Sequence, residues 1–395
     1  MSSRDRVVIA GSTGSIGVQG LEVVRDNPER FEVVGLGANS SVAELAKQVV
    51  DFGVNRVAIT DASRASELQS LVPSDVELFA GPDAMVRLIQ QAPNDVVLNA
   101  VVGFAGLSVT IASLQQGNRL ALANKESLVA AGDLVWKTIS QTGAEMVSVD
   151  SEHGALHQCL RSETQGGAGD GRVVDKLLLT ASGGPFRGKT LDELQGVRVE
   201  DALAHPNWAM GPKITIDSST LFNKGLEVIE AHVLFGIDYD DIEVVVHPQS
   251  ILHSAVVFTD GSVIGQMSKP DMRLPIGYAL GYPQRLGVPY GAIDWTKLGH
   301  LSFEEPDRKT FRCLDLAFGA GRVGGVAPLW LNAANEVAVD AFLGGHMTWA
   351  GIPAIIEESL ERCPGGDQES LEAVIESDSA ARNVAREAVE KFGKK

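Results

Sequence analysis

The sequence predicts an α/β protein in three parts: a parallel sheet of βαβ units, then a mixed α+β region, then a bundle of helices. Over about the first 150 residues, short apolar runs alternate with helix-like stretches, which is typical of a Rossmann-like parallel sheet. Further along, two apolar runs meet at Asp260-Gly261, a strong signal for an antiparallel hairpin. From Cys313 to the end, apolar residues recur at helical spacing.

The N-terminal part carries the clearest strand signals. Its predicted strands are residues 7–10, 31–36, 56–60, 95–101 and 119–123, and its first two predicted helices are 16–25 and 42–50. The strand at 95–101 contains Val96-Val97-Leu98, and such a continuous apolar run indicates a strand that is buried on both faces. We therefore expect residues 1–149 to form a parallel sheet covered by helices.

The character of the sequence changes near Asp150. Beyond it, strands are expected at 176–180, 242–247, 253–259 and 262–266, and helices at 332–343, 349–362 and 369–391. The Gly-rich residues 166–171 are expected to form a flexible surface loop. Residues 283–308 contain prolines and few periodic features, which is typical of a linker. The predicted division is 1–149, 150–282, a linker at 283–308, and a helical domain at 309–395.

Composition limits the classes of function. A chain of 395 residues is too long for one ordinary core, and 44% hydrophobic with 21% charged residues is typical of a soluble globular protein. A net charge of −18 argues against general binding to nucleic acid or to anionic membranes. The apolar run after Arg6 is too short for a signal-peptide core, and no run approaches the ~18 residues needed to span a bilayer. The three cysteines, Cys159, Cys313 and Cys363, are far apart, so we expect no disulfide framework or zinc cluster and a cytoplasmic location.

A glycine-rich turn follows the first predicted strand. It reads GxxGxxG from Gly11 through Gly14 to Gly17, and a predicted helix comes directly after it. Glycines allow a tight turn and let backbone N–H groups approach a pyrophosphate, while the positive end of the helix points at the same charges. The alternative is an ordinary glycine-rich turn without a ligand. The strand–turn–helix context favours dinucleotide binding.

The end of the second strand bears on which dinucleotide is bound. Enzymes that use NAD usually place Asp or Glu there to hold the ribose 2′-hydroxyl. Here the strand is followed by Asn39, Ser40 and Ser41, which offer small polar donors and no acid that would repel a 2′-phosphate. NADP(H) is therefore favoured over NAD(H). The same three residues could equally be a helix N-cap.

Charged residues follow the predicted strand at 119–123. They form the segment Asn124-Lys125-Glu126-Ser127, at the carboxyl end of a strand where open α/β sheets bind ligands. Lys125 could anchor a hydroxyl or a phosphate, or polarise a carbonyl. The alternative is an exposed turn into a helix, capped by Asn or Ser.

Two carboxylates end the strand predicted at 146–149. Asp150 and Glu152 are two residues apart, so they lie on one face if the extended geometry persists. Adjacent carboxylates repel one another unless a cation lies between them, and oxygen ligands select a hard ion such as Mg²⁺ or Mn²⁺. The alternative is that they cap the next helix.

A third carboxylate is predicted on a helix at 221–234. The apolar stripe of this helix consists of Phe222, Leu226, Ile229 and Val233. Asn223, Lys224 and Glu227 form an adjacent polar stripe, because residues three and four apart share a face. The alternative for Lys224 and Glu227 is a surface ion pair of about 0.3–0.5 kcal/mol.

Four further segments offer polar groups. Ser182-Gly183-Gly184 follows a strand and could cradle a phosphate or be a plain turn. Residues 205–213 contain His205 and Trp208 between prolines, which suits a lid over a ligand or a loop packed on the core. Residues 217–220 read as an N-cap, although Ser218 could face a phosphate. Residues 247–250 are interpreted as structural or part of an interface.

Taken together and in order, these segments resemble the 1-deoxy-D-xylulose 5-phosphate reductoisomerase family. The segments that carry the resemblance are 11–17, 124–127, 149–153, 182–187, 205–211, 223–230 and 247–250. The C-terminal part adds 331–336, which reads Leu-Asn-Ala-Ala-Asn-Glu. The resemblance implies that NADPH and a divalent metal convert the phosphorylated sugar to 2-C-methyl-D-erythritol 4-phosphate in non-mevalonate isoprenoid synthesis, through retro-aldol cleavage, re-addition and reduction. It also implies a homodimer.

The resemblance further implies roles for individual residues. The cofactor would be bound by Thr13, Gly14, Ser15, Ile16, Asn124, Glu126 and Gly211. The metal would be bound by Asp150, Glu152 and Glu227. The sugar phosphate would be bound by Lys125, Ser151, Glu152, Ser182, His205, Ser218, Asn223, Lys224 and Glu227, with Trp208 covering it.

One segment departs from the family pattern, and two other classes of protein share the predicted dinucleotide-binding turn. Many members carry a basic segment where this chain has Asn39, Ser40 and Ser41, so preference for NADPH over NADH could be relaxed. A different NADP-linked dehydrogenase, such as a semialdehyde or homoserine dehydrogenase, would not need three carboxylates for a metal. A dinucleotide-sensing regulator would bind NADPH without turnover.

Overall fold

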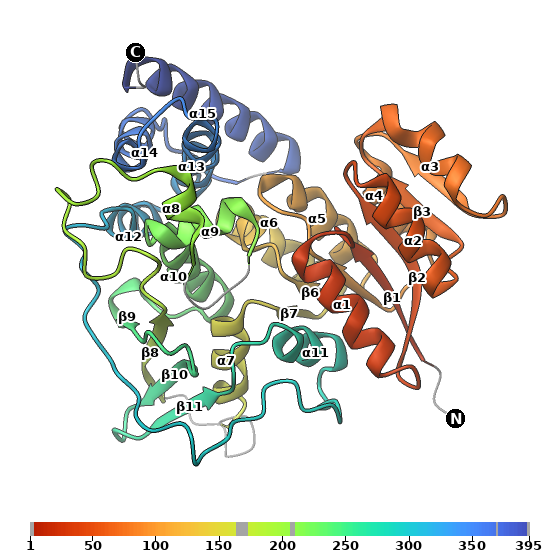
Figure 1. Ribbon diagram of the computed structural model, residues 1–395, viewed down its shortest axis with the longest axis horizontal. Helices are drawn as coiled ribbons and strands as arrows, with labels where there is room; N and C mark the ends of the chain where they lie inside the picture. Colours follow the sequence, from red (N-terminus) through yellow and green to blue (C-terminus); the bar gives the residue numbers. More distant parts are fainter. Residues whose placement is uncertain (1–3, 163–172, 206–209, 369, 393–395) are drawn as a thin grey trace. The chain divides into compact units, whose positions relative to one another are not determined.

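The computed structural model describes residues 4–162, 173–205, 210–368 and 370–392. The predicted fold class is confirmed, with a parallel sheet and helices first, a second sheet in the middle and helices at the end (Figure 1). The chain forms two compact units, which are described separately. Unit 1 combines residues 1–127, 135–154 and 271–290, and unit 2 combines 128–134, 155–270 and 291–395. The division into 1–149, 150–282, 283–308 and 309–395 stays a prediction.

Unit 1 is built on a sheet of seven parallel strands in the order β4-β3-β2-β1-β5-β6-β7. The strands are β1 (Asp5–Ala10), β2 (Phe31–Ala38), β3 (Arg56–Ile59), β4 (Glu77–Ala80), β5 (Val96–Asn99), β6 (Arg119–Leu122) and β7 (Met146–Ser148). The strand order reverses between β1 and β5. A reversal of this kind opens a crevice at the carboxyl ends of the two strands, where open α/β sheets bind ligands.

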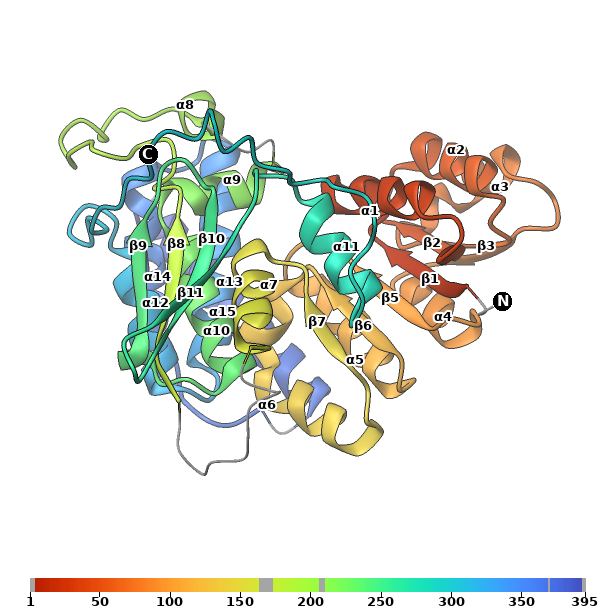
Figure 2. The same cartoon turned by 90° about the horizontal axis from the view of Figure 1, so that it is seen from below.

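Helices cover both faces of this sheet. They are α1 (Ser15–Asp26), α2 (Val42–Phe52), α3 (Ala65–Leu71), α4 (Ala84–Gln91), α5 (Leu107–Gln115) and α11 (Arg273–Gly281). Figure 2 shows α1 and α2 on one side of the sheet and α4 and α5 on the other. This follows from right-handed crossovers that run in opposite directions from the reversal point. The later helix α11 packs against α1 and adds Ile276 and Leu280 to the same core as Ile9 and Leu98.

Two helices contribute residues to both units. They are α6 (Lys125–Thr142) and α7 (Ser151–Leu160). Their first turns, which carry several of the predicted site residues, belong to unit 1.

Unit 2 contains a four-stranded sheet in the order β11-β10-β8-β9, in which β8 and β9 are parallel and the other pairs antiparallel. Its strands are β8 (Val174–Ala181), β9 (Ile242–Val246), β10 (Leu252–Phe258) and β11 (Val263–Met267). The hairpin predicted at Asp260-Gly261 is present, and Asp260 Oδ1 accepts a hydrogen bond from Ser262 N–H at 2.9 Å. The Gly-rich residues 166–171 lie outside the described residues.

The helices of unit 2 share one core with this sheet. They are α8 (Val199–Leu203), α9 (Pro212–Ser219), α10 (Phe222–Phe235), α12 (Cys313–Val323), α13 (Ala327–Leu343), α14 (Ile352–Glu361) and α15 (Leu371–Phe392). Leu177 of β8, Phe222 of α10 and Leu331 of α13 belong to a single cluster of buried apolar residues. Residues 283–308 contain no helix or strand, and their Glu304 forms an isolated bridge to Val246.

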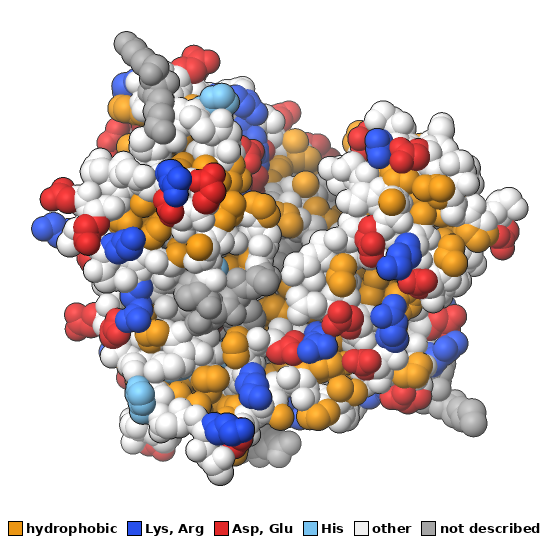
Figure 3. All heavy atoms as spheres, in the orientation of Figure 1, with side chains coloured by type: hydrophobic (Ala, Val, Ile, Leu, Met, Phe, Trp, Pro, Cys, Tyr) orange, Lys and Arg blue, Asp and Glu red, His pale blue; other side chains and the backbone are white. Residues whose placement is uncertain are grey.

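Charged side chains of both signs lie next to one another on the face of the molecule shown in Figure 3. In the part of the chain that the structure describes, exposed ion pairs join Arg6 to Asp95 at 2.8 Å and Arg187 to Glu304 at 2.7 Å. Among the described residues, no helix combines the length and the apolar character needed to cross a membrane.

Candidate active site

The loop between β1 and α1 lies against the backbone of the neighbouring strand. Gly11 has a φ of +83°, and a Cβ atom there would lie 2.5 Å from the carbonyl oxygen of Ala100, just after β5. A Cβ atom on Gly17 would lie 2.2 Å from the carbonyl oxygen of Gly11. Both positions therefore require glycine, because any side chain would push the loop out of the crevice.

The N-terminus of α1 is directed at this loop. Gly14 occupies its N-cap position, no side chain caps the helix and its first turn contains no acidic residue. Backbone N–H groups and the positive helix end are therefore available to a negatively charged group. The four predicted pyrophosphate residues, 13–16, all reach the surface, whereas Ser12 is buried and donates a hydrogen bond to Gln48 Oε1 of α2 at 2.7 Å.

The residues after β2 are exposed. Asn39 Oδ1 accepts a hydrogen bond from the hydroxyl of Thr60 at 2.6 Å, which ties the end of β2 to the end of β3. Ser41 stands at the N-cap position of α2 but makes no side-chain capping hydrogen bond. The capping alternative is therefore not realised by the Ser41 hydroxyl, and Asn39, Ser40 and Ser41 present polar groups at the carboxyl edge of the sheet.

Asn124 connects the loop after β5 to the start of α6. Its side-chain nitrogen donates to the carbonyl oxygens of Val101 and Gly103 at 2.8 and 2.7 Å, and its oxygen accepts from Ser127 N–H at 3.2 Å. Glu126 also accepts a hydrogen bond from Asn124, at 3.2 Å. Asn124 thus caps α6, as one interpretation of the sequence held, and at the same time fixes the loop that faces the glycine turn.

Lys125 forms an ion pair with Asp150 inside unit 1. Their side chains are only 7% and 11% exposed. The interpretation of Lys125 as part of an exposed turn is therefore wrong. His153 Nδ1 lies 3.2 Å from the other oxygen of Asp150. Because burying a charge without a partner is costly, this pairing fixes the carboxylate and the ammonium group in place.

The extended geometry considered for Asp150 and Glu152 does not persist. Strand β7 ends at Ser148 and α7 begins at Ser151, so Glu152 lies in the first helical turn. Asp150 Oδ1 accepts a hydrogen bond from Glu152 N–H at 3.2 Å, and such a bond at a helix start favours the helix over a longer strand. Glu152 also accepts a hydrogen bond from the hydroxyl of Ser151.

In unit 2, the polar stripe of α10 is buried. Glu227 pairs with Lys224, and its other oxygen accepts a hydrogen bond from Asn223 Nδ2 at 2.5 Å. The Lys224 and Glu227 side chains are 5% and 2% exposed, so the alternative of a surface ion pair is wrong. The predicted apolar stripe is confirmed by Phe222, Leu226 and Ile229, all buried in the core of unit 2.

Ser182, His205 and Ser218 lie in one region of unit 2. The Ser182 hydroxyl is 3.2 Å from His205 Nε2 and accepts a hydrogen bond from Gly184 N–H, also at 3.2 Å. Gly184 has a φ of +69°, and a Cβ atom there would lie 2.6 Å from the carbonyl oxygen of Ser218. Burial lowers the pKa of His205 below its ordinary value. These groups are of the kind that bind a phosphate.

The segment around Gly211 differs from the prediction. Pro212 is the first residue of α9, where a proline is tolerated, so helical structure begins inside the proposed lid of 205–213. Gly211 occupies the N-cap position of this helix. Trp208 lies outside the described residues. The predicted N-cap at 217–220 is wrong, because Asp217 and Ser218 form the last turn of α9.

Sequence reasoning missed the main role of Asp217. It is buried and pairs with Lys213 at 2.8 Å and with Asn335 Nδ2 of α13 at 2.7 Å. The spacing of four between Lys213 and Asp217 could have indicated the ion pair. The contact with Asn335 spans 118 residues and leaves no local signal. The same holds for Gln48, which binds Ser12 across 36 residues.

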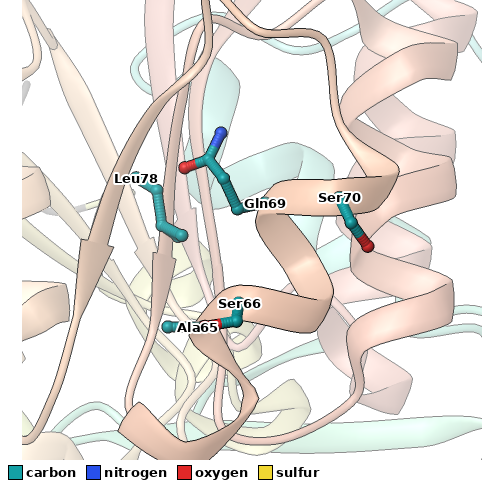
Figure 4. A pocket seen from close by; sticks show the side chains of 5 residues that line it. All are labelled: Ala65, Ser66, Gln69, Ser70 and Leu78. Atoms are coloured by element: carbon teal, nitrogen blue, oxygen red, sulfur yellow. The ribbon is translucent and has the colours of Figure 1, made fainter.

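A shallow hollow lies elsewhere in unit 1. It has a volume of about 480 Å³ and is lined by Ala65, Ser66, Gln69, Ser70 and Leu78. Figure 4 shows it between α3 and β4, and β4 is an edge strand of the sheet. The glycine loop instead follows β1, in the middle of the sheet, and no charged side chain lines the hollow. The chemistry of the site therefore does not lie there.

Comparison with known proteins decides the family. Models of the 1-deoxy-D-xylulose 5-phosphate reductoisomerase family match residues 7–132, 146–235 and 267–384. The relative from Pelotomaculum thermopropionicum is 50% identical over 380 residues, which cover 96% of this chain and 97% of the relative. The chain belongs to this family. The member from Rhodococcus jostii is 49% identical and covers 98% of the chain and 95% of its own length.

Solved structures of reductoisomerases agree in fold. That of Zymomonas mobilis in complex with NADPH has a TM-score of 0.89 and 39% identity, and covers 99% of this chain and 100% of its own. A second reductoisomerase structure, in complex with NADPH, fosmidomycin and magnesium, has a TM-score of 0.91 and 37% identity, and covers 98% of both chains.

Proposed function

We propose that unit 1 binds the cofactor and that unit 2 binds the phosphate end of the sugar in the reductoisomerase reaction. The chain is an oxidoreductase that uses NADPH to convert 1-deoxy-D-xylulose 5-phosphate to 2-C-methyl-D-erythritol 4-phosphate, with Mg²⁺ as its metal cofactor. The observation that carries this function is the 50% identity that extends over 96% of the chain. The roles of individual residues are our proposal.

In unit 1, residues 13–16 hold the pyrophosphate of NADPH through the backbone at the start of α1. The uncapped helix end and the two close glycines support this role. Asn39 and Ser40 contact the 2′-phosphate as neutral donors. Asn124, Glu126 and Gly211 contact the remainder of the cofactor.

Asp150, Glu152 and Glu227 would hold the metal. The donor set fits, because carboxylate oxygens are the preferred ligands of Mg²⁺. Asp150 pairs with the buried ammonium group of Lys125, and Glu227 pairs with that of Lys224. Each of these two carboxylates therefore already faces a positive charge. When bound, the metal polarises the carbonyl and the adjacent hydroxyl of the sugar.

The chain's own residues bind and orient the sugar. Lys125, buried and fixed by Asp150, donates hydrogen bonds to substrate oxygens, as Ser151 does beside Glu152. Lys224 and Asn223 are held by Glu227 on one rigid helix, which fixes the direction of their donors. Ser182, His205 and Ser218 bind the phosphate. The segment with Trp208 covers the substrate and excludes water from the aldehyde intermediate.

We also propose that the protein is a cytoplasmic homodimer. Strand β11 is an edge strand whose Val263 and Ile264 side chains are 57% and 39% exposed, and an apolar edge of this kind can pair with a second copy. All three cysteines are free, which suits a reducing compartment. Light scattering after size-exclusion chromatography tests the assembly. A mass of one 41.8 kDa chain would contradict the dimer.

The reaction is tested by following NADPH oxidation after adding 1-deoxy-D-xylulose 5-phosphate with Mg²⁺, and then with excess chelator. We expect turnover that stops with chelator and returns when Mg²⁺ is added back. The variants Asp150→Asn and Glu227→Gln each remove the charge of one proposed metal ligand and keep the size of the side chain. Tight NADPH binding without turnover in the unmodified protein would reject the proposed reaction.

A further inference from the structure

Asp217 in the last turn of α9 has both carboxylate oxygens engaged within unit 2. One oxygen accepts a hydrogen bond from Asn335 Nδ2 at 2.7 Å, and the other pairs with Lys213 Nζ at 2.8 Å. The Asp217 side chain is 1% exposed and that of Lys213 is 16% exposed. A buried carboxylate held from two elements resists displacement, because each lost partner would leave charge unpaired in the interior.

Asn335 belongs to the segment 331–336, to which the sequence assigned no task. It lies on α13, is fully buried and reaches α9 across 118 positions of the chain. Its orientation is determined by chemistry, because an ionised carboxylate only accepts hydrogen bonds and the amide nitrogen must therefore face Asp217. Its amide oxygen has no hydrogen-bond partner among the described residues, so the hydrogen bond from its amide nitrogen to Asp217 is the interaction that compensates for burying this side chain.

Helix α9 carries Ser218, the residue next to Asp217. A Cβ atom added to Gly184 would lie 2.6 Å from the carbonyl oxygen of Ser218, so the turn after β8 closely approaches the end of α9. The hydroxyl of Ser219 accepts a hydrogen bond from Trp349 Nε1 at 2.8 Å. The last turn of α9 is thus held from the turn after β8, from the 3₁₀ turn Trp349–Gly351 and from α13. Of these contacts, only the one between Asp217 and Asn335 is also linked to the first turn of α9, because Asp217 pairs with Lys213 in that turn.

We propose that Asp217 and Asn335 are positioning residues for the phosphate end of the substrate. They set the place of Ser218 relative to Ser182 and fix Lys213 at the start of the helix. The inference rests on the proposed substrate site, and it assigns to α13 a task in substrate binding that is separate from building the core. Loss of the contact should raise KM for the sugar phosphate more than KM for NADPH, because Ser218 in the last turn of α9 moves directly, whereas of the proposed cofactor contacts only Gly211, at the opposite end of α9, lies on this helix.

The same helix provides a matched control. Asn332 lies one turn before Asn335, is equally buried and donates a hydrogen bond to Glu336 at 3.0 Å. Glu336 in turn accepts a hydrogen bond from Arg382 of α15. Asn332 is joined to the C-terminal helix rather than to α9. Truncating either asparagine removes one hydrogen bond from a buried amide to a carboxylate, so both variants should lose similar stability. Only Asn335→Ala should disturb α9.

The experiment compares Asn335→Ala, Asp217→Asn and Asn332→Ala for KM of the sugar phosphate, KM of NADPH, melting temperature and competitive inhibition by inorganic phosphate. For the first two variants we expect KM of the sugar and the inhibition constant of phosphate to rise about 5- to 30-fold, with KM of NADPH within about twofold. Asn332→Ala should stay within about twofold in all three constants. Asp217→Asn keeps size and shape, so it provides the test if Asn335→Ala folds poorly.

Two results would overturn the inference. One is an equal rise in KM for the sugar and for NADPH in Asn335→Ala. The other is the same small effect on sugar and phosphate in Asn335→Ala, Asp217→Asn and Asn332→Ala. Ser218→Ala is measured in parallel. If it is the one variant that raises KM of the sugar phosphate and the inhibition constant of phosphate, only the role of Asp217 and Asn335 fails. If Ser218→Ala also has no effect, the proposed substrate site itself fails.

Discussion

Replacing Gly184 by alanine should weaken binding of the sugar phosphate without removing any group that contacts it. Gly184 has a φ of +69°, where a left-handed conformation costs a residue with a Cβ atom roughly 1–2 kcal/mol. The new Cβ atom would also lie 2.6 Å from the Ser218 carbonyl oxygen, whereas ordinary contact begins at 3.4 Å. Since both groups are backbone-anchored, the turn or the end of α9 must move by most of an ångström.

The magnitude follows from that displacement. A misplacement of about 1 Å in a positioned binding group can reduce activity on the order of 100-fold. We therefore expect kcat/KM for the sugar phosphate to fall about 10- to 100-fold, mainly through KM, which corresponds to about 1.4–2.7 kcal/mol. KM for NADPH should change little, because the glycine loop belongs to unit 1 and Gly211 lies at the opposite end of α9 from the collision.

Gly188 provides the control. It has a φ of +81°, but a Cβ atom there would meet nothing within 4 Å. Gly188→Ala thus has the same conformational cost without the collision. Initial rates of NADPH oxidation over a range of sugar concentrations, together with melting curves, separate the two effects. If both variants lose stability alike and neither changes KM, the contact between Gly184 and Ser218 does not position the phosphate site.

Three further outcomes are expected. Gly17→Ala places a Cβ atom 2.2 Å from the carbonyl oxygen of Gly11, so NADPH affinity, measured by fluorescence titration, should fall at least about tenfold; unchanged affinity would contradict the role of the loop. Glu227→Gln should raise the half-saturating Mg²⁺ concentration about tenfold or more, and a normal Mg²⁺ dependence would remove Glu227 from the metal site. Burial lowers the pKa of His253 to about 4, so an unfolded chain takes up a proton first as pH falls below about 6.5, and the native state loses up to roughly 3 kcal/mol by pH 4. In melting experiments, the stability difference between the unmodified protein and His253→Gln should therefore become smaller as pH falls from about 6.5 to about 4. A difference that stays constant would refute the reasoning.

The parallel sheet of unit 1 could be predicted because short stretches of the sequence are enough to indicate its strands and its glycine turn. Runs such as Val96-Val97-Leu98 are apolar on both faces, and the glycine turn after β1 stands where such a sheet binds ligands. The apolar stripe of α10 was equally readable from its spacing.

Burial and long-range pairing could not be predicted in the same way. The spacing of Lys224 and Glu227 fits a surface ion pair as well as a buried one, and only the packing around α10 decides between them. Asp217 resembles a helix cap in sequence, yet its partner Asn335 lies 118 residues away. The start of α7 at Ser151 depends on an interaction between Asp150 and a backbone amide, which competes closely with a longer strand.

The return of α11 to the core of unit 1 has a consequence for biosynthesis. Residues 271–290 complete a sheet domain whose other segments end at residue 154, so more than a hundred residues are synthesised before the domain can close. Until then the surface of α1 that α11 covers stays exposed on the nascent chain. A fragment that ends near residue 154 would keep that apolar surface open, and unit 1 should become soluble on its own only when residues 271–290 are joined to it or added as a separate peptide.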